Sequence, residues 1–410
     1  MNTKWRHALL AAALLFATGQ VAAAPVRNPL TLYTFCKDAY ASRHRCWGGK
    51  WPMELVAGPD GNYYGITAAG GIQTGDGYGG GVVYRLDPVS RTLQVLHQFD
   101  RQSEGAGPQP WLRVGPDGNL YGALASGGPG GAGNIFRLTL NGDFTMVHAL
   151  GPGEGPAYNA IMDNEGNWFG TKYRYEPDGP EFPEIYEISA DGIFKILYTF
   201  DSPEPMPSGL VLASDGNLYG VTEFGGQFGN GTAFRLSRDG DFTDLHDFTR
   251  AEGNPSGDAT ALPPGPPSIG PDGALYGVLH TYSFPTVGVS MYRIGLDGQV
   301  TVQFLADFPP APFKFDFFGQ PLTFMPDGYF YGYIHLGGGT PTLFRFSLSG
   351  DFSVLENVPQ PIMSPAWNRP RPVPVSSLIR GFDDALYGTN YQGGEHRTGS
   401  IFRYLPPPVE

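Results

Sequence analysis

The sequence predicts an all-β protein: a seven-bladed β-propeller with four-stranded blades, in which the N-terminal strand completes the last blade and closes the ring. Three observations lead to this fold. The chain of 410 residues contains 60 glycines and 39 prolines, together roughly twice the usual share, which indicates many tight turns. One short motif occurs seven times. The last copy lacks a strand that is found instead at the other end of the chain.

The repeated motif has the pattern Pro-Asp-Gly-Asn-Leu-Tyr-Gly. Its seven copies occupy residues 59–65, 116–122, 164–170, 214–220, 271–277, 326–332 and 382–388. The acidic residues of successive copies are separated by 57, 48, 50, 57, 55 and 56 residues. A period of this length is typical of one four-stranded propeller blade. Because 41% of the residues are hydrophobic and only 16% are charged, the chain has enough apolar surface for a folded core, and disorder is disfavoured.

Each repeat predicts its strands in the same order. An apolar first strand, such as residues 111–114, runs into Asp-Gly, which is a strong hairpin signal. A second strand, such as residues 120–124, ends at a glycine-rich loop. In the third strand, apolar residues flank a charged one, as in Ile-Phe-Arg-Leu at 135–138, which indicates one buried face. A further turn leads to the fourth strand, for example residues 144–150.

Only six fourth strands follow their own repeats. The seventh repeat stops at Tyr404, whereas Leu-Tyr-Thr-Phe at residues 32–35 matches the fourth-strand sequence at residues 197–200. A linear array of repeats has no reason to divide one repeat between its two ends. A closed ring does, because the N-terminal strand then covers the open edge of the last blade.

The N-terminus resembles an export signal. Lys4 and Arg6 precede the apolar residues 8–17, and small residues follow at 22–24, as in a secretory signal peptide. The apolar run is shorter than the roughly 20 residues that a membrane span requires. We therefore expect residues 1–24 to be a signal peptide, residues 25–410 to form a single propeller domain, and the protein to be secreted or periplasmic. We expect no transmembrane segment and no C-terminal anchor.

Charge and cysteine content narrow the possible partners. The formal net charge is −13, and removal of Lys4 and Arg6 with the signal peptide would make it −15. Nucleic acid is therefore not an expected partner. The two cysteines, Cys36 and Cys46, should form a local disulfide in an oxidising compartment. A metal site with His44 as a further ligand is the alternative for this pair.

These elements resemble a known repeat family. The Asp-Gly-Asn-Leu-Tyr-Gly motif, the diglycine after the second strand, the Ile-Phe-Arg-Leu strand and the Leu-His-x-Phe strand resemble the Gloeobacter/Verrucomicrobia ("GloVer") tandem repeats. The resemblance covers nearly the whole chain after the signal peptide. It implies an exported propeller and brings no established activity, cofactor or catalytic residue.

Candidate functional residues are those that depart from the repeat. Four places after the Tyr or Phe of each motif, where the second strand is expected to end, the seven repeats carry Ala68, Ala125, Tyr173, Glu223, His280, His335 and Tyr391. Two imidazoles and a carboxylate can bind one divalent metal ion, or act as an acid–base pair beside the Tyr391 phenol. Polar residues at strand ends beside loops are also ordinary, so a purely structural role is the alternative.

The leading hypothesis from the sequence is a binding protein without enzymatic activity. The chain contains no nucleophile elbow, phosphate loop, His-Glu-x-x-His motif or dinucleotide fingerprint. Loop-proximal aromatic residues such as Trp111 and Tyr173 suit stacking on sugars or gripping a peptide. We thus expect a monomer that binds an extracellular glycan or protein on its loop face. The rival hypothesis is a metal-assisted lyase or hydrolase with an axial site at Glu223, His280 and His335; a structural envelope component is a third.

Overall fold

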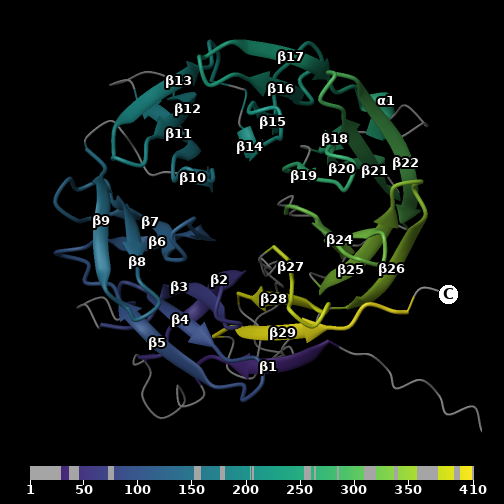
Figure 1. Cartoon of the computed structure of the whole chain (residues 1–410). Coiled ribbons are helices and arrows are strands. Elements are labelled where there is room, and N and C mark those ends of the chain that lie inside the picture. The colour runs from purple at the N-terminus through teal and green to yellow at the C-terminus, as the bar shows by residue number, and fades with distance from the viewer. Residues whose placement is uncertain are drawn as a thin grey trace, which may run out of the picture.

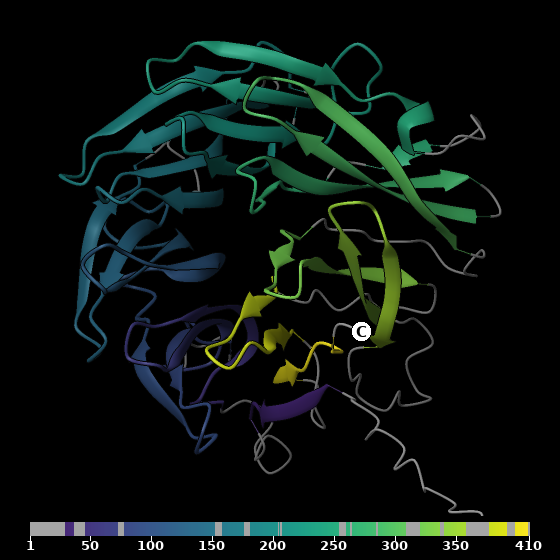
Figure 2. The same cartoon turned by 45° about the vertical axis from the view of Figure 1, so that its right-hand side comes forward.

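The predicted propeller is present. The computed structural model describes residues 29–36, 46–72, 78–151, 158–175, 181–203, 205, 207–253, 260–262, 265–283, 286–308, 320–336, 340–357, 377–391 and 398–408. Within them, seven antiparallel sheets stand in a ring around one axis (Figure 1). The first strand of each sheet lies nearest the axis and the fourth lies on the outside (Figures 1 and 2). The proposed signal peptide lies outside the described residues.

The blades follow the repeats in chain order. The first three consist of β2 (Lys50–Ala57), β3 (Tyr63–Ala69), β4 (Val82–Leu86) and β5 (Leu93–Gln98); β6 (Ala106–Val114), β7 (Leu120–Ser126), β8 (Asn134–Leu138) and β9 (Phe144–Ala149); and β10 (Tyr158–Met162), β11 (Trp168–Tyr175), β12 (Glu181–Ile188) and β13 (Phe194–Thr199). The fourth consists of β14 (Pro207–Leu212), β15 (Leu218–Thr222), β16 (Thr232–Leu236) and β17 (Phe242–Asp247).

The last three blades include a divided first strand and the strand that closes the ring. They consist of β18 (Thr260–Leu262), β19 (Ser268–Ile269), β20 (Leu275–Ser283), β21 (Thr286–Ile294) and β22 (Val300–Phe308); β23 (Thr323–Phe324), β24 (Tyr329–Leu336), β25 (Thr340–Ser347) and β26 (Phe352–Asn357); and β27 (Ile379–Arg380), β28 (Leu386–Asn390), β29 (Ser400–Tyr404) and β1 (Leu30–Thr34). In the fifth blade, β18 and β19 both pair with β20 in place of one continuous first strand. Pro266 and Pro267 lie between them and cannot donate ladder hydrogen bonds.

The N-terminal strand closes the ring as predicted. β1 pairs with β29 in an antiparallel register that places Leu30 opposite Arg403. The pairing continues past the strand, where the Phe35 amide donates to the Gly399 carbonyl at 3.0 Å. The predicted disulfide joins Cys36 to Cys46, with their Cα atoms 5.3 Å apart. The disulfide therefore ties the closing strand to the segment that enters the first blade.

The acidic residue of the motif organises the turn between the first two strands. In the second blade, Asp117 accepts hydrogen bonds from the side chain of Asn119, from the Tyr121 hydroxyl and from Arg137 of the third strand. Burial acts to raise the pKa of Asp117, but the hydrogen bonds from Asn119 and Arg137 outweigh it and lower the pKa to about 2. Asp, Asn and Tyr of the motif and Arg of the third strand thus form one structural network, as expected for turn residues.

The final glycine of the motif makes room for an aromatic ring. Gly122 lies directly opposite Phe136 in the β7–β8 ladder, and a Cβ atom on it would come within 2.6 Å of the Phe136 ring. The same contact recurs in the other six blades, at the glycines 65, 170, 220, 277, 332 and 388. These rings are buried, and the apolar clusters combine residues from neighbouring blades, for example Ile135 with Tyr186. The core therefore lies between the blades.

The third blade replaces this network by a different one. Its motif has Phe169 in place of the tyrosine, and its third strand has Glu187 in place of the arginine. Arg238, from the fourth blade, fills the gap: its Nη2 lies 2.5 Å from Asp163 and 3.3 Å from Glu187, and its guanidinium lies over the Phe169 ring at 4.8 Å. One cation from the neighbouring blade thus compensates for both substitutions.

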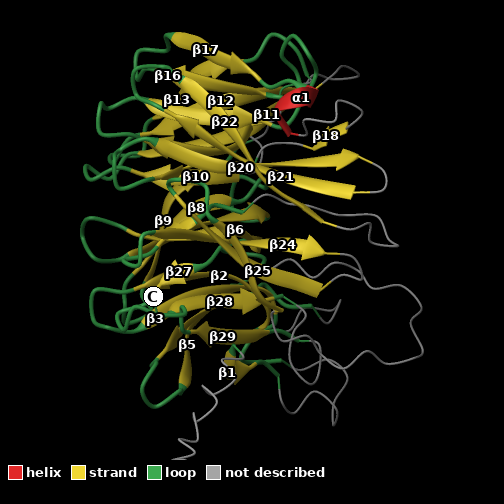
Figure 3. Ribbon diagram, turned by 90° about the vertical axis from the view of Figure 1, so that its right-hand side faces the viewer, coloured by secondary structure: helices red, strands yellow, loops and turns green. Residues whose placement is uncertain are grey.

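The two faces of the ring differ. On one side, loops connect the second strand of each blade to the third, and the fourth strand to the next blade; we call this side the loop face. It lies at the right in Figure 3 and carries α1 (Arg250–Gly253). The Asp-Gly turns lie on the opposite side, the turn face. None of the described helices is long and apolar enough to cross a membrane.

Candidate functional site

The predicted site residues lie towards the loop face, but not all of them end a strand. β15 and β28 end immediately before Glu223 and Tyr391, as expected. β11, β20 and β24 instead continue beyond Tyr173, His280 and His335, because in these blades the hairpin ladder is longer. The expected strand end was therefore wrong for three of the five polar positions.

The proposed metal set falls partly outside the described residues. The backbone of His280 lies opposite Val289 in β21, and that of His335 lies opposite Pro341 in β25, but their side chains are not among those described. Glu223 is half-buried, and burial raises the pKa of its carboxyl. Within the described part of the chain, no group of three or more His, Cys, Asp or Glu side chains suits a metal ion. The metal hypothesis stays a prediction.

Two neighbours of Tyr173 are held within their own blade. Lys172 is buried and its Nζ lies 2.7 Å from Glu184, whose other oxygen accepts a hydrogen bond from the Thr199 hydroxyl. The guanidinium of Arg174 lies over the Phe182 ring at 5.1 Å. Tyr173 itself is half-buried opposite Pro183. These contacts stabilise the β11–β12 hairpin and leave Lys172 unavailable for a ligand.

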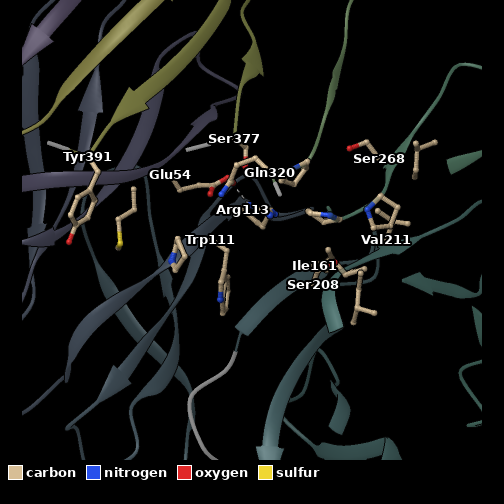
Figure 4. A pocket seen from close by; sticks show the side chains of 18 of the residues that line it. Glu54, Trp111, Arg113, Ile161, Ser208, Val211, Ser268, Gln320, Ser377 and Tyr391 are labelled. Atoms are coloured by element: carbon tan, nitrogen blue, oxygen red, sulfur yellow. Dashed lines mark hydrogen bonds and ion pairs between the residues drawn. The ribbon is translucent and has the colours of Figure 1, made fainter. Parts of the chain in front are cut away.

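A cavity of about 730 Å³ occupies the axis of the ring. The first strands of all seven blades, or the residues beside them, contribute to its wall, together with Tyr391 (Figure 4). Trp111 lies in β6, only 2% exposed, and packs against Trp168 with the ring centroids 5.3 Å apart. Of the six predicted binding residues, the cavity therefore brings together Trp111 and Tyr391, whereas Tyr173 and Glu223 are not part of its described wall.

One ion pair crosses the wall of this cavity between the first two blades. Nη1 of Arg113, in β6, lies 3.3 Å from Oε1 of Glu54, in β2, and also donates to the Leu112 carbonyl. The Glu54 side chain is 8% exposed. Burial raises the pKa of its carboxyl to about 7, although the charge and hydrogen bond of Arg113 act in the opposite direction. The carboxyl thus changes charge close to neutral pH.

Tyr391 also belongs to an aromatic stack at the loop face. Its ring is stacked on Trp51, with the centroids 5.7 Å apart and the planes at 20°. Tyr78, which is 53% exposed, lies on Trp51 at 6.1 Å, and the Nζ of Lys50 is 4.7 Å from the centre of the Trp51 ring and 5.0 Å from that of Tyr78. We call Lys50, Trp51, Tyr78 and Tyr391 the aromatic platform.

The backbone at the centre of the platform is strained. Trp51 has φ = 62°, a left-handed conformation that a bulky residue rarely adopts and that costs on the order of 1–2 kcal/mol. Its amide donates to the Thr398 carbonyl at 2.7 Å, which ties it to the last blade. Strain of this kind persists where the surroundings enforce it and is common at binding sites.

Comparison with known proteins identifies the repeat. The sequence profile of the Gloeobacter/Verrucomicrobia repeat matches residues 31–180. This match and the seven-bladed ring fit a propeller built from Gloeobacter/Verrucomicrobia repeats. No curated protein has significant sequence similarity to it.

Solved structures resemble this repeat propeller in fold only. A polysaccharide lyase, Uly1, has 11% sequence identity and a TM-score of 0.53, with 86% of this chain and 89% of the lyase covered. A puromycin hydrolase has 12% identity and a TM-score of 0.48, with 83% of this chain and 50% of the hydrolase covered. A gluconolactonase from Xanthomonas campestris has 13% identity and a TM-score of 0.41, with 92% of this chain and 95% of the lactonase covered.

The sequence contained a signal for Glu54 and Arg113 that the search along the second strands did not use. Two positions of the first strands can be compared across the seven repeats. Six places before the motif's acidic residue, the repeats carry Glu54, Trp111, Asn159, Gly209, Pro266, Pro321 and Ser377. Four places before it, they carry Val56, Arg113, Ile161, Val211, Ser268, Thr323 and Ile379. At each of these two positions, only one repeat has a charged residue. Because first strands line the axis, these two stand out as candidates. Trp51, Lys50 and Tyr78 carry no comparable signal.

Proposed function

We propose that this protein binds a glycan on its loop face, at the aromatic platform beside the mouth of the axial cavity. The observation that carries the proposal is the stack of Tyr78, Trp51 and Tyr391. It offers Tyr78 to solvent and Tyr391 to the cavity. Sugar rings bind aromatic rings through their apolar C–H faces, while their hydroxyl groups remain hydrated.

The strained backbone of Trp51 supports a role in binding. A residue whose only role is packing gains nothing from a left-handed conformation, whereas a platform residue must be held in one orientation. Preorganised rings lose little conformational freedom when a ligand binds, which favours affinity. The neighbouring disulfide of Cys36 and Cys46 constrains the segment that leads to Lys50 and Trp51.

The test measures binding of soluble oligosaccharides and polysaccharides by titration calorimetry. We expect Tyr78→Ala and Tyr391→Ala each to weaken binding at least about fivefold, which corresponds to roughly 1 kcal/mol for one aromatic contact. Phe382→Ala is the matched control, because Phe382 is similarly exposed, at 58%, but belongs to the Asp383–Asp384 turn on the turn face. Equal affinity of all three variants and the wild type would overturn the proposal.

We further propose that residues 1–24 direct export and that residues 25–410 form the mature protein. The Cys36–Cys46 disulfide supports this, because structural disulfides persist mainly in oxidising compartments outside the cytosol. N-terminal sequencing of the protein recovered from periplasm or culture medium should begin near residue 25. Recovery of the whole chain from the cytosol with reduced cysteines would contradict it.

A further inference from the structure

The axial cavity is almost without charge. Its described lining consists of prolines, aliphatic and aromatic side chains and a few uncharged polar groups, and Glu54 and Arg113 are its two charged residues. Its volume of about 730 Å³ lies within the range of about 300–1,000 Å³ common for small-ligand sites. Whatever binds here meets one guanidinium and one carboxyl group in largely apolar surroundings.

Arg113 keeps part of its binding capacity unused. A guanidinium carries five N–H donors in a rigid fork. The bonds of Arg113 to Glu54 and to the Leu112 carbonyl both start from Nη1, and the side chain remains 35% exposed. Nε and Nη2 have no protein partner in the described part of the chain. Together these two nitrogens form the side of the fork that binds a carboxylate through two parallel hydrogen bonds.

Glu54 compensates the charge of Arg113 only in part. With a pKa of about 7, its carboxyl is largely protonated in mildly acidic solution, and Arg113 is then a cation without a counterion in an apolar cavity. The other ionisable groups nearby do not replace it. The Tyr84 phenol is buried beside Glu54, and burial raises its pKa far above neutrality, while burial also raises the pKa of Tyr391. A half-buried cation without a counterion in an apolar cavity favours the binding of an anion.

We propose that the axial cavity binds the carboxylate of a single acidic sugar residue, with Nε and Nη2 of Arg113 as the two donors and with Trp111 and Tyr391 in the wall beside the sugar. This rests on the proposed glycan binding and specifies its ligand. The net charge of −13 disfavours long polyanions, so the acidic residue is a single group within an otherwise neutral oligosaccharide.

The charge of Glu54 makes this binding dependent on pH. Below pH 7 the protonated Glu54 carboxyl can donate to the ligand, and above pH 7 its carboxylate repels it. A group with a pKa of about 7 is about 90% protonated at pH 6 and about 10% protonated at pH 8. If only the protonated form binds, affinity at pH 6 exceeds that at pH 8 about tenfold.

The test compares two probes that differ only in charge: a disaccharide with one glucuronate residue, and its methyl ester. We expect calorimetry at pH 6 to show at least about tenfold tighter binding of the acid. Arg113→Gln should abolish this preference, and Arg113→Lys, which keeps the charge but not the fork, should retain only part of it. Glu54→Gln should bind the acid with the same affinity at pH 6 and pH 8.

The outcomes separate this inference from the proposed function. If acid and ester bind equally and Arg113→Gln changes neither, while Tyr78→Ala weakens both, the carboxylate site is wrong and glycan binding stands. If Tyr78→Ala and Tyr391→Ala leave the binding of every saccharide unchanged, glycan binding itself fails. Acetate bound as tightly as the acidic disaccharide would overturn the assignment to a sugar acid. Near-ultraviolet circular dichroism of each variant checks that the ring is folded.

Discussion

The contact between the motif glycine and the facing aromatic ring predicts a specific destabilisation. In Gly122→Ala, the new Cβ would lie 2.6 Å from Cζ and 3.0 Å from Cε1 of Phe136. Ordinary carbon–carbon contacts are about 3.5–4.0 Å, so the overlap is roughly 1 Å. The ring cannot retreat easily, because it is fully buried and packs against Phe99 and Phe144 at centroid distances of 5.1 and 5.8 Å.

The expected cost follows from two opposing effects. Overpacking of a well-packed core costs about 1–3 kcal/mol. Alanine also restricts the unfolded chain, which stabilises the folded protein by about 0.4–1 kcal/mol where the native backbone conformation suits alanine. Gly122 is such a position, because its φ is not positive. We therefore expect Gly122→Ala to lower the free energy of unfolding by about 1–2 kcal/mol. Gly48→Ala is the control: a Cβ there meets no atom within 4 Å, so we expect a change below about 0.5 kcal/mol.

A double-mutant cycle tests whether the clash is the cause. Urea unfolding with the disulfide intact gives the midpoint, and an unchanged slope shows that the denatured state is not altered. Phe136→Leu removes the atoms that the new Cβ meets. If the reasoning is right, Gly122→Ala costs almost nothing in the Phe136→Leu background, so the two changes are coupled by about 1–2 kcal/mol. Additive effects of the two substitutions would refute it.

Three further predictions concern the buried carboxyl, the disulfide and the proposed metal set. The folded protein binds the Glu54 proton more tightly than the unfolded chain does, so the free energy of unfolding should fall as pH rises from about 4.5 to 7. The free energy of unfolding of Glu54→Gln should therefore rise by on the order of 3 kcal/mol relative to that of the wild type between pH 4 and pH 8. An equal difference between the two proteins at both pH values would contradict this. Replacing Cys36 and Cys46 by serine should lower the free energy of unfolding by about 2–3 kcal/mol, measured by urea unfolding, and no change would show that the disulfide does not constrain the unfolded chain. If His280 and His335 bind a metal ion, elemental analysis of protein purified without chelator should find about one equivalent that is absent from the double alanine variant, whereas metal-free wild-type protein would end that hypothesis.

The fold could be predicted because the sequence of each repeat determines the strands and turns of its own blade. Asp117, Tyr121 and Arg137 are close in sequence, and their contacts form within one blade. The same three residue types recur in six of the seven repeats, which makes the pattern clear. Ring closure could also be predicted from the sequence, because residues 32–35 match the fourth-strand sequence at residues 197–200. Strand lengths were not: nothing in the motif indicates that β20 continues to Ser283.

The candidate site was harder to predict because its residues meet through the ring rather than through the repeat. Glu54 and Arg113 are 59 residues apart and face each other only because two first strands converge on the axis. Trp51 and Tyr391 come from the two ends of the described propeller and stack only because the ring is closed. Contacts of this kind depend on the geometry of the assembled ring, which no single repeat encodes.

Not every residue that departs from the repeat points to a ligand, as a comparison of Arg238 with Arg113 shows. Arg238 and Arg113 are equally exposed, at 35%. Arg238 meets Asp163, Glu187 and the Phe169 ring, so the changes in the third blade cancel one another and have a structural explanation. Arg113 has one carboxyl partner, Glu54, whose burial raises its pKa to about 7, and the pair is therefore not balanced within the fold. A charge that the fold leaves unbalanced on the axis of a propeller has no structural reason to be there, which is why we assign it to a ligand.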